Sequence, residues 1–100
     1  MTEDTRLHEE SIAARWRAAY DSDDLLTVIA ALYAQEINVG LQTFWDGGLD
    51  VWIGDEMNGR KVTENFRPED IGQVAQWLKL SAEQCYPVLR ARRIGDLAYV

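Results

Sequence analysis

The sequence predicts an α+β fold. It is a two-layer sandwich in which a three-stranded antiparallel meander packs on helices, in the order α-α-β-β-β-α with a C-terminal tail. Residues 40–66 contain three short runs that suit strands, separated by two glycine-containing turns. Residues 5–37 before this stretch and residues 68–85 after it carry apolar side chains at helical spacing. Together these observations favour one sheet flanked by helices.

Two helices are predicted before the sheet, over residues 5–20 and 24–37. Between them lies the polar break Asp21-Ser22-Asp23-Asp24, whose carboxylates suit a helix N-terminus. One fused helix over residues 10–37 is an alternative. The second helix is apolar around most of its circumference, so we expect it to be buried, and Asn38 and Gly40 would end it. The apolar residues are Ile12, Ala13, Trp16, Ala19 and Tyr20, then Leu25, Leu26, Val28, Ile29, Leu32 and Tyr33.

The turns predict the register of the meander. A three-residue loop at residues 46–48 places Thr43 opposite Val51. A two-residue turn at Asn58-Gly59 places Val51 opposite Phe66. The same turn sets Glu56 opposite Lys61, a pairing of opposite charges that supports this register.

This register predicts one strongly apolar face, which should pack on the helices. It carries Leu41, Thr43, Trp45, Leu49, Val51, Ile53, Val62 and Phe66. The opposite face carries Trp52 and Phe44 among polar residues. If the first loop has two residues, the first strand shifts by one, so Phe44 turns inward and Trp45 turns outward.

A last helix is predicted from Pro68 to about Cys85. Proline at the first helical position and acids in the first turn are typical of a helix start, and Pro87 ends the pattern. Residues 88–100 suit a short helix, an edge strand or a loose tail. We therefore expect a single domain over residues 1–87, followed by a C-terminal tail, residues 88–100, whose conformation the sequence does not decide.

Composition indicates an ordinary globular protein of 100 residues, with 47% hydrophobic and 27% charged side chains. The single cysteine, Cys85, excludes an intrachain disulfide and fits a reducing compartment. The polar, acidic N-terminus does not resemble a secretory signal. The longest apolar-rich run, Leu25 to Ala34, is too short to span a membrane. We expect a cytoplasmic protein with no membrane partner.

The net charge of −7 disfavours nucleic acid as a partner, because the acidic body would repel a phosphate backbone. The order helix–strand–strand–strand–helix resembles that of the double-stranded-RNA-binding domain. That family has lysines at the start of its last helix, where this chain has Pro68, Glu69 and Asp70. The resemblance is one of topology, and no residue or function is carried over from it.

No catalytic, cofactor or metal motif accompanies the predicted fold. His8 is the single histidine and lies in an acidic segment typical of a solvated helix face. Cys85 falls on the apolar stripe of the last helix, which favours a structural thiol. A Cys/His zinc site is excluded by count, and the acids do not match a calcium loop.

The aromatic residues of the meander are the predicted binding residues: Phe44, Trp45 and Trp52. Exposed tryptophan is enriched in binding hot spots. A second copy of the chain, a different protein or small apolar ligand, or the tail from residue 88 could cover this face. Our hypothesis is a small non-catalytic interaction or adaptor domain whose partner is a protein or a second copy. The alternative is a small-molecule-binding or hydrolytic domain, with a cleft between sheet and helices lined by Trp77, Tyr33 and Asp50.

Overall fold

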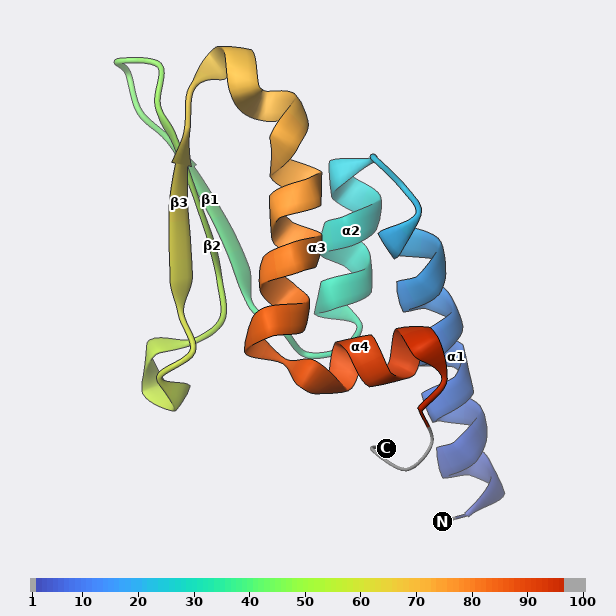
Figure 1. The fold of residues 1–100 in the computed structure, drawn as a ribbon. Helices are drawn as coiled ribbons and strands as arrows, with labels where there is room; N and C mark the ends of the chain where they lie inside the picture. Colours follow the sequence, from blue (N-terminus) through green and yellow to red (C-terminus); the bar gives the residue numbers. More distant parts are fainter. Residues whose placement is uncertain (1, 97–100) are drawn as a thin grey trace.

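A computed structural model describes residues 2–96 and has the predicted α+β architecture (Figure 1). The helices are α1 (Glu3–Tyr20), α2 (Leu25–Tyr33), α3 (Val74–Cys85) and α4 (Pro87–Ile94). The strands are β1 (Val39–Thr43), β2 (Leu49–Ile53) and β3 (Val62–Phe66), and the 3₁₀ helices are η1 (Glu56–Asn58) and η2 (Pro68–Gln73). The strands form an antiparallel sheet in the order β1-β2-β3. The predicted fold class is confirmed.

The helices lie on one side of the sheet. Figure 1 shows the sheet at the left, α2 and α3 beside it, and α1 beyond them at the right. α3 packs against β2 and α2 against β1, while α4 crosses one end of the layer and contacts α1 and α3. The core therefore lies between the inner face of the sheet and these helices. Its buried side chains include Leu32, Leu49, Val51, Ile53, Phe66, Leu78 and Leu89.

The register of the first hairpin differs from the prediction by two residues. Thr43 pairs with Leu49 rather than with Val51. The loop has three residues, 45–47, one position earlier than predicted. It is closed by a hydrogen bond of 2.8 Å from the Phe44 amide to the Gly48 carbonyl. Gly47 supplies the left-handed residue that this loop needs, with φ of 93°.

The second hairpin also differs by two residues, since Val51 pairs with Glu64 rather than with Phe66. Asn58-Gly59 is not a two-residue turn; η1 occupies the connection, and Gly59 follows it with φ of 66°. Lys61 and Glu56 still form an ion pair of 3.2 Å, although Glu56 lies in η1 and not in a strand. A shift of two keeps the parity of each strand, so the alternation of apolar residues could not detect the error. The placement of Trp45 on the face that packs on the helices is wrong, because Trp45 lies in the loop and is exposed.

The two N-terminal helices are separate, so the fused helix is excluded. Asp24 caps α2, and its carboxylate accepts a hydrogen bond of 3.1 Å from the Thr27 amide. The predicted C-terminal end at residue 37 is wrong, because α2 ends at Tyr33. The expected burial of this helix is only partly correct. Val28, Ala31 and Leu32 are buried, whereas Leu26 and Tyr33 are exposed.

The C-terminal part contains more helix than the sequence indicated. The predicted last helix divides into η2 and α3, so Ile71 falls in the 3₁₀ segment and is exposed. The conformation of residues 88–100 was left open by the sequence, and residues 87–94 form α4. Leu89 is fully buried in the core, and α4 lies away from the outer face of the sheet (Figure 1). Leu97 and Tyr99, which could have covered that face, lie outside the described residues.

A polar cluster joins α1, α3 and α4. The fully buried Trp16 donates a hydrogen bond of 3.1 Å from its indole Nε1 to the Glu83 carboxylate. Glu83 also pairs with Arg93 at 2.7 Å, and the Arg93 guanidinium lies 4.0 Å from the centroid of the Tyr20 ring. The carboxylate raises the pKa of Arg93 above its ordinary value through this hydrogen bond. Buried Lys79 donates hydrogen bonds to the carbonyls of Tyr20 and Ser22, which close the C-terminal end of α1.

Candidate functional site

The outer face of the sheet carries two of the three predicted binding residues. Trp52 and Phe44 have the parity opposite to that of the buried Val51 and Ile53, so they lie on the face away from the helices. The row formed by Gln42 and Asp50 separates them. The structure thus places both aromatic side chains on one face without bringing their rings together.

Trp52 is half-buried although it lies on the outer face. Its indole lies over Gly40, its partner in β1, and a Cβ atom on Gly40 would overlap with the ring. The Lys61 ammonium lies 5.4 Å from the ring centroid. The contacts with Gly40 and Lys61 thus cover a large part of the Trp52 ring, and Trp52 helps to stabilise the sheet.

Trp45 is the most exposed large hydrophobic side chain of the described residues. Its exposure is 99%, and Phe44 beside it is 42% exposed. The sequence left open which of the two would turn outward. Both are accessible, because Trp45 lies in the loop and Phe44 ends the outer face. Neither faces the core.

The loop that carries Trp45 is held by several hydrogen bonds. Besides the bond from Phe44 to Gly48, the Gly47 amide donates to the Phe44 carbonyl at 3.0 Å. The Asp46 carboxylate accepts a bond of 3.2 Å from the Gly48 amide. Such an Asx turn and a left-handed glycine define the local backbone. The loop therefore presents Trp45 from an ordered hairpin end.

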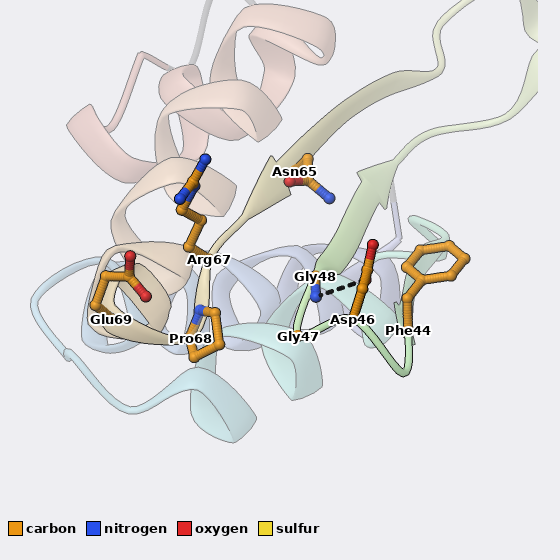
Figure 2. Close-up of a pocket in the computed structure, with 8 residues that line it drawn as sticks. All are labelled: Phe44, Asp46, Gly47, Gly48, Asn65, Arg67, Pro68 and Glu69. Atoms are coloured by element: carbon orange, nitrogen blue, oxygen red, sulfur yellow. Dashed lines mark hydrogen bonds between the residues drawn. The ribbon is translucent and has the colours of Figure 1, made fainter.

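An open concavity of about 660 Å³ lies beside this hairpin end. Figure 2 shows the hairpin residues on one side, with Phe44 at the outside, and Arg67, Pro68 and Glu69 on the other. Asn65 lies between the two sides and donates a hydrogen bond of 2.8 Å to Asp50. The lining thus combines one aromatic ring and one proline ring with charged groups of both signs.

The structure does not bring together the residues of the alternative cleft. Asp50 lies on the outer face of the sheet, and Tyr33 is exposed on α2. Trp77, on α3, packs edge-on against Phe66 with 5.8 Å between ring centroids. These side chains lie on three different surfaces. His8 is exposed on α1, and Cys85 is half-buried at the end of α3.

The exposed apolar side of α2 was missed by the sequence reasoning, which expected that helix to be buried. A signal was present, because a helix apolar all round needs cover on every side.

Residues 2–96 contain no group of three His, Cys, Asp or Glu side chains that could hold a metal ion. None of the described helices is long and apolar enough to cross a membrane.

Comparison with known proteins returned no relative. No family model matches the chain, no curated protein matches it, and no solved structure matches it.

Proposed function

We propose that this chain is a small non-catalytic protein-interaction domain whose binding surface is the hairpin end and outer face of the sheet. The observation that carries the proposal is the 99% exposure of Trp45 on an ordered loop. Tryptophan is over-represented among residues that dominate binding energy, and a large apolar ring in water gains free energy when a partner covers it.

Phe44 and Trp52 extend the surface along the sheet. Phe44 is a second anchor, since its exposed ring adjoins Trp45 in sequence. Trp52 offers the remaining accessible part of its ring, with Lys61 beside it. We assign it a smaller share of the binding energy, because Gly40 and Lys61 already contact it.

The concavity beside the hairpin supports a protein partner. Arg67 and Glu69 supply charged groups across the concavity from the apolar anchor Phe44 (Figure 2). Protein interfaces combine apolar anchors with polar and charged groups around them. The partner is either a different protein or a second copy of the chain.

Site-specific photo-cross-linking tests the proposal. Benzoylphenylalanine replaces Trp45 in one variant and Met57 in the control, because Met57 is also highly exposed but lies in η1, in the connection at the opposite end of β2. We expect a cross-linked protein from position 45 that is absent from position 57. The captured protein, once purified, should bind the wild type at least tenfold more tightly than it binds Trp45→Ser, whereas Met57→Ser should not change its affinity.

The same experiment separates the two kinds of partner. If position 45 captures the chain itself, light scattering should give the mass of a dimer for the wild type and of a monomer for Trp45→Ser. The proposal fails if both positions cross-link the same proteins equally. It also fails if Trp45→Ser leaves the affinity for the captured protein unchanged.

A further inference from the structure

Helix α2 exposes an apolar stripe that lies outside the binding surface proposed above, the hairpin end and outer face of the sheet. Leu26 is 73% exposed and Tyr33 is 81% exposed, with the half-buried Ala30 between them. These residues are spaced by four and three, so they lie along one side of the helix. α2 contains no charged residue between Leu25 and Tyr33. We call Leu26, Ala30 and Tyr33 the α2 stripe.

The neighbouring strand β1 also exposes an apolar side chain. β1, the strand that α2 contacts, carries Leu41 on the same side of the sheet as the helices. Leu41 is 41% exposed, because the helices do not fully cover this edge of the sheet. An apolar helix side next to an incompletely covered edge strand is typical of a docking surface.

Carboxylates lie at both ends of the α2 stripe. Asp23 and Asp24 precede the helix, and Glu36 follows it, and all three are exposed. Residues 18–59 contain no lysine or arginine, and their eight charged side chains are all acids. They are Asp21, Asp23, Asp24, Glu36, Asp46, Asp50, Asp55 and Glu56.

Two cations from other elements reach α2 or its approach, but both have partners. Arg92 donates to the Gln35 side chain at 3.1 Å and forms an ion pair with Glu9. Lys79 is buried and donates to the Ser22 carbonyl. The charged side chains of the segment that carries the α2 stripe are therefore all negative.

Glu36 occupies a position that disfavours it. It has φ of 62°, and it is the single non-glycine residue of the described chain with a positive φ. The Ile37 amide donates to the Leu32 carbonyl and the Glu36 amide to the Tyr33 carbonyl. These bonds define a Schellman motif, in which glycine is the usual residue at the place of Glu36. A carboxylate also opposes the negative end of the helix dipole there.

The Glu36 carboxylate adjoins an open concavity formed with Tyr33, Ala34, Ile37 and Asn38. A carboxylate, a phenol ring and an amide oxygen are the groups that recognise a lysine or arginine side chain. The α2 stripe thus ends beside groups suited to a cation, and one of them, Glu36, has a backbone conformation that disfavours it.

We propose that the α2 stripe docks an amphipathic segment of another protein, in which apolar residues are flanked by lysine or arginine. Apolar residues would cover Leu26 and Tyr33, and the basic flanks would meet Asp23 at one end and Glu36 at the other. A second copy fits poorly. An antiparallel two-fold contact of α2 with itself would oppose the Asp24 end to the Glu36 end.

Binding of synthetic peptides to the full chain tests this proposal. The probe is an amphipathic peptide about 18 residues long with a leucine stripe and lysines at both ends. The control peptide has the same leucines and glutamates in place of the lysines. Fluorescence anisotropy at two salt concentrations gives the affinities, and amide chemical shifts locate the bound peptide. Sedimentation gives the mass of the free protein.

We expect the lysine peptide to bind at least tenfold more tightly than the glutamate peptide, and salt to reduce this preference. The shift changes should lie in residues 23–38. Leu26→Ser with Tyr33→Ser should reduce affinity at least tenfold, while Trp45→Ser should not change it, which separates this surface from the hairpin end. Glu36→Gly should weaken binding yet raise the melting temperature.

Several outcomes would overturn the proposal. They are equal affinity for the two peptides, no binding of either, or shift changes outside residues 23–38. A wild-type dimer that Leu26→Ser with Tyr33→Ser converts to monomer would instead assign the stripe to a second copy. A Glu36→Gly protein that binds as well as the wild type would remove the cation site.

Discussion

The indole of Trp52 lies directly over Gly40, its partner in the neighbouring strand. Glycine is a poor strand residue, because it contributes no side chain to packing. The ring of Trp52 supplies the missing cover on the outer face. The pair explains why a tryptophan on a face without helices is half-buried.

A side chain at position 40 should destabilise the sheet. Gly40→Ala places a Cβ atom where the indole lies, so the ring must leave its position. We expect the free energy of unfolding to fall by about 1–3 kcal/mol, as for overpacked sites. Urea unfolding measures this change. Gly72→Ala is the control, since a Cβ atom there meets no neighbour within 4 Å and Gly72 is not among the positive-φ glycines. Equal stability of the two variants would contradict this account of Trp52.

Removal of the Glu83 carboxylate should strongly destabilise the fold. Glu83→Ala leaves the Trp16 indole N–H and the Arg93 guanidinium without their shared acceptor. We expect a loss of about 2–4 kcal/mol in the free energy of unfolding, because buried groups then lack partners. The control is Glu10→Ala, which removes an exposed ion pair with Arg6 and should cost less than about 1 kcal/mol. Similar losses in the two variants would argue against a joining role for Glu83.

Substitution of Trp45 should leave the stability of the fold nearly unchanged. Trp45→Phe should change the free energy of unfolding by less than about 0.5 kcal/mol, because the side chain makes few contacts. It should also shift the tryptophan emission of the native protein to shorter wavelength, since the most solvated indole is lost. Emission spectra and urea unfolding measure both effects. An unchanged emission maximum would mean that the Trp45 ring is covered in solution.

Glycine at position 36 should stabilise the fold. Glu36→Gly removes the left-handed strain of a residue with a Cβ atom and a carboxylate at a helix C-terminus. We expect a gain of about 1 kcal/mol, measured by thermal unfolding. The converse control is Gly95→Ala at the end of α4, where φ is 77°, which should cost a similar amount. A destabilised Glu36→Gly protein would show that the carboxylate contributes to the fold.

The sequence was sufficient for the faces of the sheet but not for its register. Leu49, Val51, Ile53 and Phe66 are buried as their alternation predicted. Alternation has a period of two, so a shift by two in each hairpin leaves it unchanged. The loop geometry decides the register. η1 and the loop beginning at Trp45 depend on hydrogen bonds that no periodic pattern records.

Of the candidate site, the sequence identified the aromatic residues and the parity of Phe44 and Trp52. How far each of these rings is exposed depends on the tertiary structure. Trp52 is half-covered because Gly40 lies opposite it, and Trp45 is exposed because the loop begins one residue earlier than expected. The polar cluster of Trp16, Glu83 and Arg93 joins residues far apart in the chain, so no local pattern could reveal it.

By itself, the sequence determined the segments of α1, α2, α3 and the three strands, and the parity of each strand, because both follow from local spacing along the chain. It left α4 open. The tertiary structure alone decided which apolar sides are covered. The apolar side of a helix or strand is covered only where other helices or strands pack against it. α2 meets α1, α3 and β1 and keeps Leu26 and Tyr33 in solvent, while the edge strands keep Leu41 and Val62 partly exposed. Trp45 is exposed because it lies in the hairpin loop, beyond the last paired residues Thr43 and Leu49.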